Sequence, residues 1–85
     1  IDDSAFFRKS IPNLLSDKGF SVTTVESATK AYQLLEAGLN FNLIITDLHM
    51  PDINGEEFAT QCANDNRFQN IPIIALSSNI SSDIL

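Results

Sequence analysis

The sequence predicts an α/β fold in which helices cover both faces of a parallel sheet. Two apolar runs rich in β-branched residues, 41–46 and 71–76, have the length and composition of buried strands. Apolar residues recur at helical spacing in three other segments, 7–18, 28–35 and 56–64. Strands that alternate with helices along a chain imply right-handed crossovers and parallel pairing. We therefore expect one doubly wound domain.

The amino-terminal segment supplies one helix and parts of two strands. Residues 1–4, Ile-Asp-Asp-Ser, are interpreted as the last residue of a strand, two acids and a helix cap. The helix that follows contains Pro12, where we expect a kink or a local adjustment, and Gly19 is a natural stop for it. Residues 20–25, with Phe20 facing inward, predict a short strand.

Composition narrows the class of function. Eighty-five residues allow one domain with a marginal core, and a hydrophobic share of 44% is typical of a globular chain. A net charge of −6 with five Lys and Arg residues disfavours direct nucleic-acid binding. No apolar segment approaches the roughly 20 residues of a membrane span. The single Cys62 excludes an internal disulfide, is compatible with a reducing cytoplasm and is predicted to be a core residue.

Asp47 ends the most apolar run of the chain. After it, Met50-Pro51 forces an extended residue, and Asn54-Gly55 indicates a turn or a helix start. Ligands of open α/β sheets bind at the carboxyl ends of the strands, which is where Asp47 is expected. A lone Asp at this place would more often cap or terminate the strand, so the other acids decide the interpretation.

The predicted strand ends gather Asp2, Asp3, Asp47 and Ser77 at one edge of the sheet. Three carboxylates without basic partners repel one another unless a cation neutralises them. Carboxylate ligands suit Mg²⁺, which accepts a few of them and keeps several waters. Metals that prefer imidazole or thiolate are disfavoured because the chain has one His and one Cys.

These segments give the chain a resemblance to the receiver domain of two-component response regulators over nearly all its length. The segments that carry it are the acidic pair within 1–4, the segment 47–55 and the segment 72–77. The resemblance implies a flavodoxin-like, doubly wound parallel sheet in three αβα layers. Residues 1–85 would be a partial receiver domain, incomplete at both ends, because most of the first strand and the last strand and helix are absent.

The resemblance also implies roles for individual residues. Asp47 would accept a phosphoryl group, and Asp2, Asp3, Asp47 and the backbone carbonyl of His49 would hold Mg²⁺. Ser77 matches the hydroxyl residue that meets the phosphoryl oxygen and couples modification to a surface change. An aspartate can act as the nucleophile of phosphoryl transfer, with the metal supplying positioning and charge neutralisation.

The chain departs from the family pattern at a lysine. Receivers carry a lysine on a fifth strand that contacts the phosphoryl group, and no residue of this sequence matches it. Lys9, Lys18 and Lys30 cannot be carried onto that role. Because a receiver without its first strand should not be stable, we expect these residues to belong to a longer chain.

We expect a cytoplasmic signalling domain that takes a phosphoryl group from a sensor histidine kinase or a phosphotransfer protein and switches its contacts with an output domain or protein. It would not be an enzyme, although it takes part in its own phosphoryl transfer and dephosphorylation. Segments 3–8 and 75–78 most resemble chemotaxis receivers, some of which are attached to the chemotaxis kinase or to a coupling protein.

Two alternatives remain. The first is a degenerate receiver that serves only as a protein-binding surface. The second is a Mg²⁺-dependent phosphohydrolase with an aspartyl nucleophile, which is disfavoured because residues 47–49, Asp-Leu-His, lack the second acid of the usual Asp-x-Asp pattern.

Overall fold

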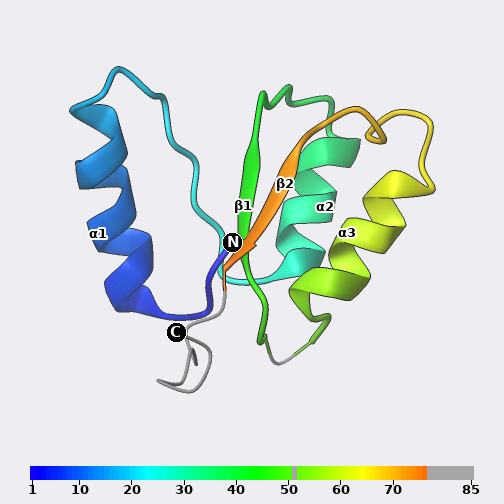
Figure 1. Ribbon diagram of the computed structural model, residues 1–85, viewed down its shortest axis with the longest axis horizontal. Helices are drawn as coiled ribbons and strands as arrows, with labels where there is room; N and C mark the ends of the chain where they lie inside the picture. The colour runs from blue at the N-terminus through cyan, green and yellow to red at the C-terminus, as the bar shows by residue number, and fades with distance from the viewer. Residues whose placement is uncertain (51, 77–85) are drawn as a thin grey trace, which may run out of the picture.

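The computed structural model describes residues 1–50 and 52–76, which form three helices and two strands (Figure 1). In chain order these are α1 (Ala5–Ser16), α2 (Ala28–Glu36), β1 (Ile44–Asp47), α3 (Gly55–Ala63) and β2 (Ile73–Leu76). β1 and β2 pair in parallel, with Ile44 opposite Ile73 and Asp47 opposite Leu76. Helices alternating with parallel strands confirm the predicted α/β class.

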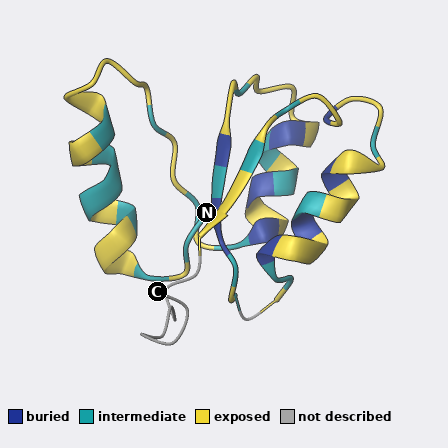
Figure 2. Cartoon of the chain, in the orientation of Figure 1, coloured by how far each residue is buried: buried dark blue, intermediate teal, exposed yellow. Residues whose placement is uncertain are grey.

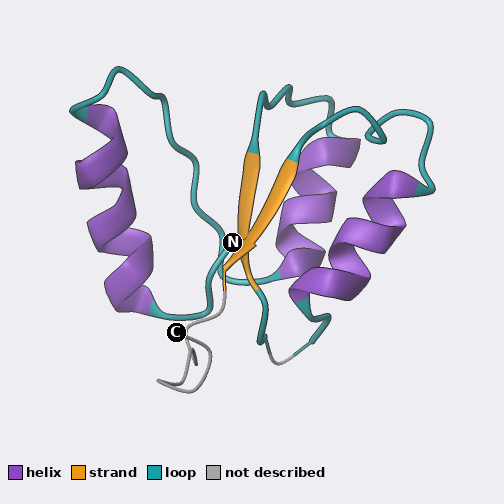
Figure 3. Cartoon of the chain, in the orientation of Figure 1, coloured by secondary structure: helices purple, strands orange, loops and turns teal. Residues whose placement is uncertain are grey.

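The strand pair lies between α1 on one side and α2 with α3 on the other (Figure 3). These elements therefore form three layers, as expected. None of the helices within the described ranges is long and apolar enough to cross a membrane.

The core lies between the strands and the pair α2 and α3, which carry their buried residues on the faces toward each other and toward β1 (Figure 2). Its buried hydrophobic residues are Ala28, Ala31, Leu35, Ile44, Phe58, Cys62 and Phe68. Phe58 is completely buried, and Cys62 is the core residue that the sequence predicted. The helical spacing in α2 and α3 thus identified the faces that pack.

α1 contributes none of its residues to the buried core. It runs without interruption through Pro12, and Gly19 follows it with a φ of 87°, a conformation that favours glycine. Its apolar residues remain accessible, since Phe6 is 71% exposed and Leu14 is 68% exposed. The apolar stripe predicted for this helix is present, with Ile11 and Leu15 half-buried, but none of its residues is fully buried by the described part of the chain.

The strand predicted at 20–25 is wrong, because this segment has no regular structure. Ile1 forms a parallel bridge to β1: its amine donates to the Ile45 carbonyl (2.6 Å), and the Asp47 amide donates to the Ile1 carbonyl (2.8 Å). On the other side, the Asp2 amide donates to the Val25 carbonyl (3.0 Å). Among the described residues, this bond is the contact that joins 20–25 to residues 1–2.

These bonds nevertheless define an order across the sheet. Val25, residues 1–2, β1 and β2 follow one another from edge to edge. This succession agrees with the flavodoxin-like doubly wound fold that the resemblance implies, in which the first strand of the chain lies between the second and the third. Its switch point, where ligands bind in such folds, lies between residues 1–2 and β1.

The connection between α3 and β2 is fixed to α2 by an aromatic and ionic network. The Tyr32 hydroxyl donates to Asp65 Oδ2 (2.6 Å), and Arg67 donates through Nε and Nη2 to both Asp65 oxygens (3.0 and 2.8 Å). Phe68 packs edge-on to Tyr32 and lies under the Arg67 guanidinium. The hydrogen bonds from Arg67, and then from Tyr32, hold the pKa of Asp65 well below its ordinary value.

Replacing Asp65 with Asn is expected to lower the free energy of unfolding at neutral pH, because an ionised carboxylate accepts stronger hydrogen bonds than a neutral amide. The folded-state pKa of Asp65 is depressed, so its stabilisation is complete above the ordinary value of 3.8 and is lost as the pH falls through the folded value. The difference in the free energy of unfolding between wild type and Asp65→Asn, measured with urea, should therefore become smaller below about pH 4.

The control for this comparison is Asp17→Asn, which removes an exposed carboxylate outside the network. A difference between wild type and Asp65→Asn that stays constant from neutral to strongly acidic pH would contradict the role of the ionised carboxylate.

Candidate functional site

Three carboxylates meet at one edge of the strand pair. Oxygen atoms of Asp2, Asp3 and Asp47 all lie within 4.8 Å of one another. Asp47 is 8% exposed, Asp2 is half-buried and Asp3 is exposed. The structure therefore brings together the three acids that the sequence placed at strand ends.

Asp47 is held by the strand that ends with it. Its amide is bonded to Ile1, and the carbonyl accepts a hydrogen bond from the hydroxyl of the completely buried Thr46 (3.0 Å). One carboxylate oxygen, Oδ1, accepts from the His49 amide (3.3 Å). Backbone contacts on both sides therefore fix the direction in which this carboxylate points.

Asp2 is fixed through its own backbone and side chain. Its Oδ1 accepts from the amide of Ser4 (2.8 Å), the N-cap residue of α1, and the Ser4 side chain itself makes no capping bond. Arg8 donates from Nη1 to the Asp2 carbonyl (2.9 Å). Arg8 is not among the site residues that the sequence predicted, although an arginine in the first turn after an acidic pair is a signal that could have suggested the contact.

The remaining predicted residues differ in how far the structure describes them. His49 follows Asp47 by two residues, and it is exposed. Ser77 and Pro51 lie outside the described residues. Leu76, which precedes Ser77, accepts a hydrogen bond from the Leu48 amide through its carbonyl (2.9 Å), so the end of β2 lies beside the end of β1.

The donor set fits a magnesium ion. Within the described ranges, neither lysine nor arginine forms an ion pair with the three clustered acids, since the pairs present join Lys30 to Glu26 and Arg67 to Glu36 and Asp65. Uncompensated carboxylates this close need a counter-charge. An all-oxygen set of one buried, one half-buried and one exposed carboxylate leaves room for the waters that Mg²⁺ retains.

α3 begins in direct contact with the backbone at the end of β1. The Gly55 amide donates to the Leu48 carbonyl (3.0 Å), and a Cβ at Gly55 would lie 2.5 Å from the Asp47 carbonyl oxygen. The side chain of Asn54 caps this helix by accepting from the Glu57 amide (2.8 Å). The sequence marked 54–55 as a helix start, but the close approach to Asp47 depends on the fold.

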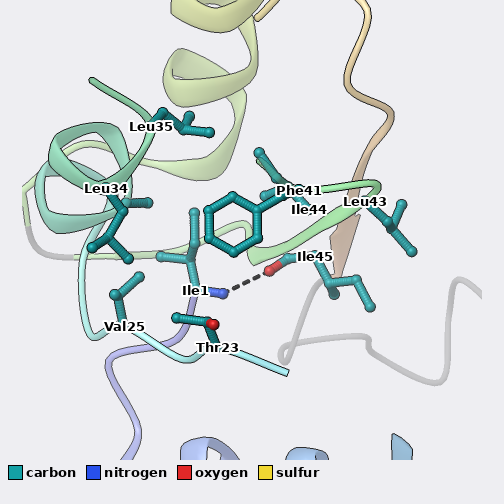
Figure 4. A pocket seen from close by; sticks show the side chains of 10 residues that line it. Ile1, Thr23, Val25, Leu34, Leu35, Phe41, Leu43, Ile44 and Ile45 are labelled. Carbon is teal, nitrogen blue, oxygen red and sulfur yellow. Dashed lines mark hydrogen bonds between the residues drawn. The ribbon is translucent and has the colours of Figure 1, made fainter. Parts of the chain in front are cut away.

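A separate apolar cavity of about 70 Å³ lies between α2 and the strands (Figure 4). Val25, Leu34 and Phe41 are among the side chains that line it, and the bond from the Ile1 amine to Ile45 crosses it. It contains no carboxylate, so we assign it no part in the chemistry of the acid cluster.

Comparison with known proteins gives one family. The family described as "Response regulator receiver domain" matches residues 1–85. Among similar proteins, the two-component response regulator ORR6 of Oryza sativa subsp. japonica is 41% identical over 80 residues, which cover 92% of this chain and 47% of that protein. The chemotaxis protein CheY1 of Helicobacter pylori is 37% identical over 79 residues, which cover 92% of this chain and 64% of that protein. The chain therefore spans about half to two thirds of these relatives.

Gly55→Ala is expected to destabilise the protein by about 1–3 kcal/mol, because the new methyl group would collide with backbone atoms that cannot rotate away. At an unhindered helical position the same change would stabilise. Urea unfolding gives the free energy of unfolding, and NMR gives the chemical shift of the Asp47 amide, which should move.

Gly38→Ala is the matched control. Gly38 follows α2 with a φ of 92° and has open space around it, so an alanine there adds backbone strain far from the acids. It should lower stability and leave the Asp47 shift unchanged. A Gly55→Ala protein with wild-type stability and shifts would show that the contact with Asp47 is not tight in solution.

Proposed function

Because the chain belongs to the response regulator receiver domain family, whose members are signalling domains, we propose that it receives a phosphoryl group on Asp47. The donor would be a histidine kinase or a phosphotransfer protein, and the output would be a changed contact with a further domain or protein. The observation that carries this proposal is the convergence of three carboxylates on the end of β1.

The choice of Asp47 as acceptor rests on its surroundings. It terminates the buried strand, and its backbone is bonded on both sides. In the transfer, a carboxylate oxygen of Asp47 forms the new bond to phosphorus while the bond from phosphorus to the donor histidine nitrogen breaks. The product is an acyl phosphate, and the protein contributes chiefly position and electrostatic stabilisation.

Asp2 and Asp3 are proposed to hold Mg²⁺ together with Asp47 and the carbonyl of His49. The bound ion would neutralise the charge of the acids and of the incoming phosphoryl oxygens. The chain's own contribution is to fix these ligands: the Ser4 amide orients the Asp2 carboxylate, and the His49 amide orients that of Asp47.

Ser77 is proposed as the hydroxyl that contacts the phosphoryl group and transmits its presence. Its predecessor Leu76 is paired with Asp47 and bonded to Leu48, which supports a position beside the acceptor. That residues 1–85 are a partial receiver domain, with the lysine elsewhere in a longer chain, stays a prediction. The phosphohydrolase alternative is set aside because the chain belongs to the receiver family.

Magnesium binding tests the ligands. NMR titration of the complete protein with Mg²⁺ should shift amides around Asp47, and Asp3→Ala should weaken the affinity because it removes one of three carboxylates. Asp17→Ala, which removes an exposed acid from the turn after α1, controls for the loss of net charge. An unchanged affinity in Asp3→Ala would exclude Asp3 from the metal site.

Phosphoryl labelling tests the acceptor. Supplied with Mg²⁺ and a phosphohistidine donor, the complete protein should gain one acid-stable, base-labile phosphoryl group. Asp47→Asn keeps the shape of the side chain but removes the nucleophile, so labelling should vanish while the fold survives. Asp3→Asn should slow labelling without abolishing it.

Mass spectrometry of the labelled peptides gives the position. Full labelling of a folded Asp47→Asn protein, or a phosphoryl group found on Asp52 or Ser77, would overturn the assignment. Absence of labelling in a wild type that binds Mg²⁺ would favour the degenerate binding module.

A further inference from the structure

Asp52, five residues after Asp47, is bonded to the first turn of α2. Its Oδ2 accepts from the Thr29 hydroxyl (2.7 Å) and from the Thr29 amide (3.3 Å). Asp52 is an exposed loop residue, and its side chain nevertheless joins two elements 23 residues apart, a contact that the sequence did not predict.

The contact acts as a second cap on α2. Ser27 already accepts from the Lys30 amide (3.2 Å) at the same helix end, so the two side chains together satisfy free amides of the first turn. A carboxylate at this end also interacts favourably with the helix dipole. The hydrogen bond from Thr29 lowers the pKa of Asp52, so the carboxylate is ionised at neutral pH.

The contact also restrains the segment that follows the acceptor. The segment begins with two bonds: the Leu48 carbonyl accepts from the Gly55 amide, and the His49 amide donates to the Asp47 carboxylate. Asp52 lies between His49 and Gly55 in the sequence and is hydrogen-bonded to α2. The bonds of Leu48 and His49 do not involve that helix. The carbonyl of His49, the proposed metal ligand, therefore lies between the anchor at Asp47 and the anchor at Asp52.

We propose that the Thr29–Asp52 pair is a positioning contact that holds the described residues after Asp47, 48–50 and 52–54, in the arrangement that receives Mg²⁺. This inference rests on the proposed function. Thr29 touches neither the metal nor the phosphoryl group; it acts through Asp52 on the placement of the His49 carbonyl. In this proposal α2 helps to position the acceptor site and also packs in the core.

The decisive variant is Thr29→Val, which removes the hydroxyl, keeps the branched shape and leaves the net charge unchanged. Thr29→Ser is the conservative rescue, because it restores the donor. Ser27→Ala is the matched control, since it removes a cap from the same helix end without contacting residues 48–50 and 52–54. Asp52→Ala removes the other half of the pair.

Two readouts are measured in the complete protein. Hydrogen exchange without metal should show faster exchange at the His49 amide in Thr29→Val and Asp52→Ala, but not in Thr29→Ser or Ser27→Ala. NMR titration should show Mg²⁺ affinity reduced roughly three- to tenfold in Thr29→Val, as expected for loss of one side-chain hydrogen bond. Urea unfolding should show both Thr29→Val and Ser27→Ala destabilised.

The outcomes separate this inference from the proposed function. Wild-type exchange and Mg²⁺ affinity in Thr29→Val would overturn the positioning contact and leave the function intact. Equal loss of affinity in Ser27→Ala would also overturn it, because the effect would then follow helix stability alone. A wild type that binds no Mg²⁺ would remove the metal site, while the exchange rates would still decide whether the pair restrains the segment.

Discussion

β1 is bonded along one edge to Ile1 and along the other to β2, and both neighbours run parallel to it. Parallel strands present their carboxyl ends at the same edge of a sheet, so the residues that follow them must converge there. Asp2 and Asp47 meet for this reason, and the end of β2 arrives beside them. The acid cluster is thus a consequence of strand direction.

The backbone around the cluster has little freedom to relax. Asp47 is bonded to Ile1 on one side and covered by the first residue of α3 on another, where even a methyl group has no room. Such tight packing of backbone on backbone keeps the carboxylates close to one another, because moving one of them would disturb a strand or a helix. The contacts that build the fold therefore also preorganise the site.

Local patterns in the sequence predicted the features that depend on neighbouring residues. The apolar run before Asp47, the helix start at 54–55 and the helical spacing around Phe58 each appear in the structure as expected. The family resemblance supplied the roles of the acids, which a local pattern could not. Features that depend on distant partners were missed, including the bond between Asp52 and Thr29.

The segment 20–25 also shows that a local pattern is not enough where a structure depends on a distant partner. Its composition favours a strand, but a strand exists only where a neighbour bonds to it along several residues, and here the bond is a single one from Asp2. The stripe on α1 is a related case, since periodicity identifies an apolar face without showing what covers it. In both cases the local sequence does not reveal which other segment would pair with the strand or cover the apolar face.

The exposed apolar side chains of β2 have a consequence for colloidal behaviour. Ile74 and Leu76, two residues apart on this strand, are 47% and 51% exposed. At neutral pH the net charge of −6 keeps copies of the domain apart. Near the isoelectric point of about 4.3 that repulsion disappears, and high salt screens it at any pH. Solubility of these residues is therefore controlled by charge, with acid and salt acting in the same direction.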